Sequence, residues 1–150
     1  MERFLAEITY GGVDGLITTF GIISSSLLLN IETEKIIILA LANVLADGFS
    51  MASGSYLSEK NRKIKKNPVQ VSIFTFMSFV CVGIIPILPF FYQKYINPSY
   101  TVRLKDIVIL YLVILSIIGM LRKNKLQGVA ETVTIGILSG IIIYYVSTRF

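Results

Sequence analysis

Five long segments of this sequence contain no Lys or Arg: Phe4–Thr33, Ile36–Glu59, Val69–Gln93, Ile107–Leu121 and Leu126–Thr148. A helix needs roughly 20 predominantly apolar residues to cross about 30 Å of hydrocarbon. The fourth segment is too short alone, so we expect its helix to begin near residue 101. Only 15% of the residues are charged, against roughly a quarter in soluble domains. We therefore predict an all-α integral membrane protein, residues 1–150 forming one transporter domain, with five transmembrane helices at about 5–29, 36–59, 68–92, 102–121 and 127–148.

Basic residues flank these segments unevenly. If the N-terminus is cytoplasmic, that side holds nine Lys and Arg residues and the other side five. Lys and Arg concentrate in cytoplasmic loops, so we predict a cytoplasmic N-terminus and a C-terminus outside the cell or in a lumen. The segment Lys60–Lys66 contributes most to this difference. We interpret it as a solvated loop that sets topology, with lipid headgroup binding as the alternative; this distribution accounts for the net charge of +5 without nucleic acid as a partner.

Prolines and small residues predict local features of the helices. Pro68 suits the first turn of the third helix, and Pro86 and Pro89 should kink or shorten that helix near its outer end. Small residues allow close helix approach. They recur every four positions on the second helix, at Ala42, Ala46, Ser50, Gly54 and Ser58. We assign packing roles to Gly11, Gly15, Gly48 and Gly54, and note the similar pair Gly136 and Gly140.

Among the acidic residues of these segments, we single out four: Glu7, Asp14, Asp47 and Glu131. An acid at the centre of a membrane helix costs roughly 2.5–3.5 kcal/mol on insertion scales. Since the helix interiors offer no Lys or Arg, we expect an exogenous cation or a proton to neutralise these acids. That pattern is typical of ion transport or ion binding. Glu131 has a second interpretation, because a negative charge near a helix N-terminus is favourable without any transport role.

The helical period places the polar residues on two facing stripes. Glu7, Asp14 and Thr18 share one face of the first helix, and Asn43, Asp47 and Met51 follow one another at four-residue steps on the second. With the turn centred near Thr33, the pairs expected at equal depth are Asp14 with Met51, Glu7 with Glu59, and Thr18 with Asp47.

The available side chains limit the chemistry of a metal site. The chain has one cysteine and no histidine, so ligands must be carboxylates, hydroxyls, amides, backbone carbonyls and methionine. A thioether beside a carboxylate shifts preference toward Fe²⁺, Mn²⁺ or Co²⁺, although Met51 also suits simple core filling. No nucleophile and base pair stands out, so we expect neither an enzyme nor a permanently bound cofactor.

Two segments carry a resemblance to a known family. The segment Tyr10–Phe20, Tyr-Gly-Gly-Val-Asp-Gly-Leu-Ile-Thr-Thr-Phe, resembles the first-helix signature of the vacuolar iron transporter family. The segment Ala42–Ala52, Ala-Asn-Val-Leu-Ala-Asp-Gly-Phe-Ser-Met-Ala, resembles its second-helix signature. Glu131–Gly136, followed by Tyr145, is similar to the family's fifth helix.

This resemblance implies a two-fold symmetric homodimer whose first and second helices line an ion pathway at the axis. Asp14 and Met51 of both protomers would surround the ion, with Asp47 as a deeper ligand or proton site and Glu7 as the ligand at the entrance. Secondary or proton-carrying positions would be Glu131, Glu59, Thr18 and Asn43. The implied activity is export of cytosolic Fe²⁺, and of Mn²⁺ or Co²⁺, into a vacuole, another organelle or the exterior in exchange for protons. The alternative is a membrane protein that binds metal, or assembles with a partner helix, without moving ions.

The sequence departs from the family pattern in three places. Plant-type members insert a cytoplasmic metal-binding domain between the second and third helices, where this chain has only Glu59–Asn67. Many members carry Glu where this chain has Ser55, and Val13 replaces the usual Asn. We therefore expect metal loading to differ, with Glu7 and Glu59 partly substituting for the missing acid.

Overall fold

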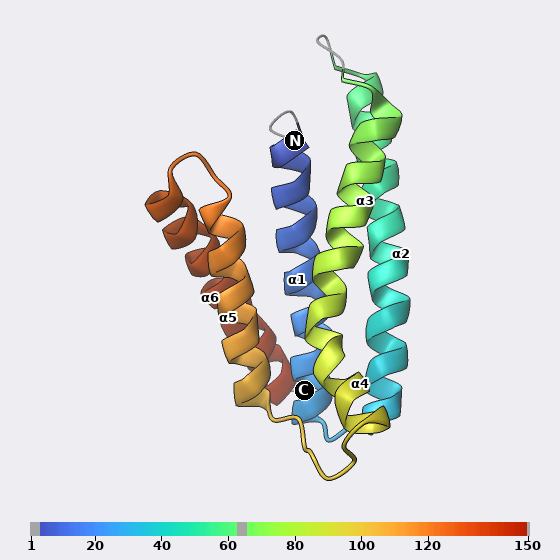
Figure 1. Ribbon diagram of the computed structural model, residues 1–150, viewed down its shortest axis with the longest axis vertical. Helices are drawn as coiled ribbons and strands as arrows, with labels where there is room; N and C mark the ends of the chain where they lie inside the picture. The colour runs from blue at the N-terminus through green and yellow to red at the C-terminus, as the bar shows by residue number, and fades with distance from the viewer. Residues whose placement is uncertain (1–3, 63–65, 150) are drawn as a thin grey trace.

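The computed structural model describes residues 4–62 and 66–149, and all of its regular elements there are helical. In chain order they are α1 (Leu5–Leu28), α2 (Thr33–Lys60), α3 (Pro68–Ile84), the short 3₁₀ helix η2 (Ile85–Ile87), α4 (Leu88–Tyr95), α5 (Leu104–Met120) and α6 (Lys125–Arg149). Figure 1 shows α1 in the middle of the bundle, with α2 and α3 on one side and α5 and α6 on the other. The predicted all-α membrane fold is confirmed for the described residues.

Four segments are long and apolar enough to cross a bilayer: Leu5–Leu28, Thr33–Lys60, Pro68–Tyr95 and Lys125–Arg149. The remaining helix, α5, has 17 residues and spans only about 25 Å. It is the segment that the sequence already marks as short. Figure 1 nevertheless shows α5 returning the chain from the end of the bundle where α4 finishes to the end where α6 begins. It therefore completes the path between the two flanking spans.

Proline chemistry sets both ends of the third span. Pro68 occupies the first turn of α3, as predicted, and the side chain of Asn67 accepts a hydrogen bond from the backbone N–H of Val69 at 3.0 Å. At the other end α3 stops at Ile84, and η2 intervenes before α4 starts. Pro86 lies within η2, where its missing N–H interrupts the α-helical ladder. The predicted kink is thus a short break in the helix.

Glycines bring α1 and α3 into backbone contact. A methyl group added to Gly15 would overlap the backbone of Phe79, and one added to Gly11 would lie 2.7 Å from the carbonyl oxygen of Thr75. Gly83 approaches the carbonyl of Gly15 from the other helix. Only residues without a side chain permit this separation. Consequently α1 is held against α3 along its first half, the part that carries Asp14.

Helices α5 and α6 pack closely against each other, and α5 contacts α1 through aromatic rings. Between α5 and α6, a methyl group added to Gly128 would overlap the carbonyl of Gly119. The ring of Tyr111 stacks on Phe20 of α1 with centroids 4.0 Å apart, and its hydroxyl lies 2.9 Å from that of Ser139. These contacts fix α1 from the side opposite α2 and α3.

Candidate functional site

The turn between α1 and α2 sets which residues of the two helices lie at equal depth. Helix α1 ends at Leu28 and α2 begins at Thr33, so the turn is centred between Asn30 and Ile31. Asn30 adopts a positive φ of 53°, the left-handed conformation that commonly follows a helix C-terminus. The sequence placed the centre near Thr33, because the polar residues after Glu32 were assigned to the turn; the structure has them in the first turn of α2.

This shorter turn changes the partner of Asp14. Counted from the observed centre, Asp14 and Asp47 lie equally far from the turn, and so do Tyr10 and Met51. The expected pairing of Asp14 with Met51 is therefore displaced by about one helical turn. Asp47 and Met51 still share a face of α2, because four residues separate them.

Asp14 and Asp47 are two half-buried carboxylates that have no basic partner among the described residues. They lie at equal depth on two helices that pack against each other. The ion pairs of the described residues involve other acids, and none includes Asp14 or Asp47. Thr18, one turn further along α1, donates its hydroxyl to the backbone carbonyl of Asp14 at 2.9 Å. Two like charges held together inside the bundle favour binding of a cation or a proton.

The expectation that an exogenous cation or a proton neutralises all four acids is wrong for Glu7 and Glu131, which pair with bases of the chain itself. The ammonium of Lys66 lies 2.7 Å from Glu7 Oε1. Glu131 binds the guanidinium of Arg122 and accepts a hydrogen bond from Gln127 at 2.8 Å. Both bases lie in turns at helix ends. The expectation from the sequence considered only bases within the helix interiors. Glu131 therefore belongs to a local pair between α6 and the turn before it.

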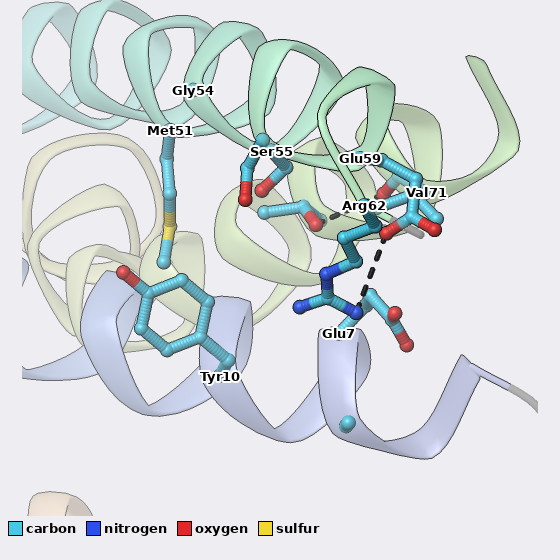
Figure 2. A pocket seen from close by; sticks show the side chains of 11 residues that line it. Glu7, Tyr10, Met51, Gly54, Ser55, Glu59, Arg62 and Val71 are labelled. Atoms are coloured by element: carbon cyan, nitrogen blue, oxygen red, sulfur yellow. Dashed lines mark hydrogen bonds and ion pairs between the residues drawn. The ribbon is translucent and has the colours of Figure 1, made fainter. Parts of the chain in front are cut away.

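A pocket of about 400 Å³ opens between α1, α2 and α3 at the end of the bundle where α1 begins. Figure 2 shows Met51 and Tyr10 pointing toward one another at one end of this pocket, with Glu7 and Glu59 at the other. Glu59 is almost fully buried, with 2% of its side chain exposed, and its Oε2 lies 3.4 Å from the guanidinium of Arg62. The pocket thus combines two carboxylates, a thioether and a phenol.

Of the other predicted positions, Asn43 and Gly48 lie apart from this pocket, whereas Gly54 lines it. Asn43 lines a shallow groove of about 630 Å³ between α1 and α2, together with Gly21, Ser25 and Ala46. Gly48 packs against Phe79 and Val80. A methyl group on Gly54 would meet no other atom within 4 Å, so this glycine is not needed for packing within one chain.

Sequence reasoning missed three residues of the pocket region: Tyr10, Arg62 and Lys66. Tyr10 stands at the start of the first-helix signature, but its exposed ring received no role. Arg62 and Lys66 were interpreted only as part of a loop that sets topology. The loop between α2 and α3 is short, and such a loop cannot keep its bases away from acids at the adjoining helix ends. The closeness in sequence of these bases to Glu59 at the end of α2 could therefore have indicated ion pairs at this end of the bundle.

One chain supplies an incomplete metal site. Within residues 4–62 and 66–149, no group of three Asp, Glu or Cys side chains lies close enough together to hold a metal ion. Divalent cations are usually bound by more ligands than two carboxylates supply. The polar residues instead form a line along the α1–α2 interface: first Glu7 and Glu59, then Met51, then Asp47 with Asp14.

Two comparisons with known proteins found matches to this chain. A segment of 60 residues, 40% of this chain, is 30% identical to a protein of Toxoplasma gondii (strain ATCC 50861 / VEG) named vacuolar iron transporter. The chain spans 20% of the length of that relative. The model of the VIT family matches residues 5–63 and residues 59–148, nearly the whole sequence. With its long apolar helices, the chain is a multi-pass integral membrane protein and belongs to the VIT family.

Proposed function

We propose that this protein transports divalent transition metal ions across a membrane, with Fe²⁺ as the first candidate substrate and Mn²⁺ or Co²⁺ as further ones. Membership of the VIT family and the name of the Toxoplasma relative support metal transport, and the ligand chemistry of the chain supports a transition metal. The metal is cargo rather than a resident cofactor.

The observation that carries this proposal is the pair Asp14 and Asp47. Charged side chains inside a membrane protein are expensive and usually mark an ion pathway or a proton relay. Here the two carboxylates lie at equal depth on neighbouring helices, and no described base neutralises them. A purely structural role would favour a hydrogen-bonded or ion-paired acid, as for Glu131. An arriving divalent cation relieves the repulsion, and a proton relieves part of it.

The missing ligands come, in this proposal, from a second copy of the chain. A two-fold axis beside α1 and α2 would double Asp14, Asp47 and Met51 and complete a site that one chain leaves incomplete. The small-residue stripe of α2 supports this arrangement, because all five of its residues are exposed in the single chain: Ala42, Ala46, Ser50, Gly54 and Ser58. Such a stripe permits close contact with another helix.

Metal enters, in this proposal, from the end of the bundle that holds Glu7 and Glu59, and the excess of basic residues assigns that end to the cytoplasm. The ion then passes Met51 and reaches the acids at Asp47 and Asp14. Protons move the other way, because carboxylates that repel each other hold protons, which metal binding must displace. Exchange of metal for protons follows from shared ligands.

Flux measurements in proteoliposomes test the proposal. We expect wild-type protein to move Fe²⁺ or Mn²⁺ when a pH gradient is imposed, and Asp14→Ala to abolish this flux. Glu32→Ala is the matched control, because it removes a carboxylate from the same hairpin at the exposed turn, where Glu32 pairs only with Lys35 at 3.1 Å. Equal loss of flux in both variants, with both proteins folded, would refute the assignment of Asp14. Folded protein that binds metal but moves none under any gradient supports the non-transporting alternative.

A further inference from the structure

Lys66 contacts both acids of the α1–α2–α3 pocket. Its ammonium lies 2.7 Å from Oε1 of Glu7, and its backbone N–H donates to Oε1 of Glu59 at 2.6 Å. Glu7 and Lys66 are 59 residues apart in the sequence, so the fold itself brings them together. Only 11% of the Glu7 side chain and 26% of the Lys66 side chain are exposed. This pair is therefore partly withdrawn from water, where an ion pair is stronger than at the surface.

Among the residues that the structure describes, the charges at the pocket balance without a metal ion. Arg62 supplies the second positive charge, through its contact with Glu59. Figure 2 shows its guanidinium reaching from the end of α2 into the space between Glu59 and Glu7. Two carboxylates thus face two bases of the chain itself. A divalent cation that binds Glu7 must take the place of a positive charge already there.

The pairing of Glu7 is nevertheless incomplete. Its second oxygen, Oε2, is buried and has no hydrogen-bond partner among the described residues. A buried acceptor without a partner is costly, so the carboxylate retains a binding capacity at Oε2. A metal ion that binds both oxygens uses that capacity, whereas the contact with the Lys66 ammonium is made through Oε1.

We propose that the Lys66 ammonium is a built-in competitor of the transported ion at Glu7. In the metal-free protein the ammonium holds the carboxylate at the mouth of the pocket, and an arriving divalent cation displaces it toward water. The long flexible stem of lysine allows this displacement while the backbone contact to Glu59 stays in place. The competition sets a threshold concentration below which metal does not load. This inference rests on the proposed function, because it regulates the same route.

Substitution of Lys66 tests the competition. We expect Lys66→Gln to lower the metal concentration for half-maximal initial flux by roughly threefold or more, without lowering the maximal flux. The matched control is Lys60→Gln, which removes the same charge from the same end of α2; Lys60 is exposed and lies over the ring of Tyr56 at 4.7 Å. A shift of equal size in the control would mean that surface potential alone is responsible, and would overturn the inference. So would an unchanged or raised half-maximal concentration in Lys66→Gln.

Equilibrium binding separates this inference from the proposed function. Mn²⁺ binding to detergent-solubilised protein is measured for wild type, Lys66→Gln, Lys60→Gln and the double variant Glu7→Gln with Lys66→Gln. Competition predicts tighter binding for Lys66→Gln alone, and loss of that gain in the double variant. If wild-type protein moves no metal but this binding pattern is observed, transport fails while the competition stands. If the double variant keeps the gain, Glu7 is not the contested ligand.

Discussion

Asp14 and Asp47 lie at equal depth on α1 and α2, so in the metal-free protein they either repel each other as charges or hold a proton, and both states are less favourable than a neutral side chain. Asp14→Asn removes one of the charges while keeping the size of the side chain. We expect this variant to unfold at a higher temperature than wild type when no metal is present. We expect a gain of about 1–2 kcal/mol, which raises the unfolding temperature by about 2–8 °C at roughly 2–4 °C per kcal/mol for a chain of this length. The measurement is thermal unfolding in detergent with a chelator.

Added Mn²⁺ makes the same experiment specific for function. Metal should raise the unfolding temperature of the wild type, since ligand that binds only the folded state stabilises it, and should raise that of Asp14→Asn much less. Binding sites commonly sacrifice stability in this way. If Asp14→Asn instead unfolds at a lower temperature than wild type without metal, the carboxylate has a structural hydrogen-bonding role.

Glu131 provides the opposite case. Its carboxylate binds Arg122 and Gln127 near the start of α6, and its side chain is 41% exposed. Because this pair is local and solvated, we expect Glu131→Gln to change neither metal flux nor the unfolding temperature appreciably. Flux in proteoliposomes checks this, beside Asp14→Ala. A loss of flux comparable to that of Asp14→Ala would return Glu131 to the pathway.

The sequence alone could predict which acids lack a basic partner only for those far from the helix ends. Asp14 and Asp47 were identifiable because they lie deep in helices whose interiors contain no Lys or Arg, beyond the reach of loop residues. Glu7 and Glu131 lie near helix ends, where a base from a neighbouring turn can reach them, and the path of that turn depends on tertiary packing. Sequence periodicity gives the face of a helix but not the position of a loop side chain.

At the scale of helices, glycines allow the backbones of α1 and α3 to come into direct contact. Gly15→Ala should destabilise the protein, because its methyl group would overlap the backbone of Phe79, which cannot rotate away as a side chain can. Overpacking of this kind costs about 1–3 kcal/mol. The matched control is Gly140→Ala on α6, whose methyl group would meet only Phe20 Cε1, at 3.8 Å.

Thermal unfolding and the monodisperse fraction after gel filtration measure the two glycine variants. Gly140→Ala should be neutral or slightly stabilising, because alanine favours helix by up to about 1 kcal/mol over glycine. If both variants behave alike, close approach at Gly15 is not what holds α1 against α3.

Helices were the most predictable level of this structure. Apolar length, the first-turn preference of Pro68 and the break near Pro86 are local properties, so each could be predicted from sequence. The turn after α1 was not, because Glu34 and Lys35 suit either a polar turn or the first turn of a helix. The structure begins α2 at Thr33, and an error of a few residues there displaced the inferred depth of every pair across the hairpin.

At the scale of the whole molecule, the exposed small-residue face of α2 is the surface through which we propose that two copies of the chain meet. Lipid contact imposes no requirement for small residues, whereas helix contact does. Ala46 belongs to the stripe, precedes Asp47 in the sequence and is exposed. If two copies meet along α2, Ala46 of one protomer lies near Ala46 of its partner, and the two Asp47 side chains flank the same axis.

Cysteine cross-linking in native membranes tests whether two copies of the chain meet along α2. Cys81 is exposed and free, so it is first replaced by Ser; Ala46→Cys is then introduced and treated with a short bifunctional thiol reagent. We expect a cross-linked dimer on a denaturing gel. The control is Val113→Cys, at a half-exposed position of α5 on the other side of the bundle, which should remain monomeric. Cross-linking at Val113 but not at Ala46 would place the interface away from α2, leaving Asp14 and Asp47 without the second pair of carboxylates that a complete metal site needs.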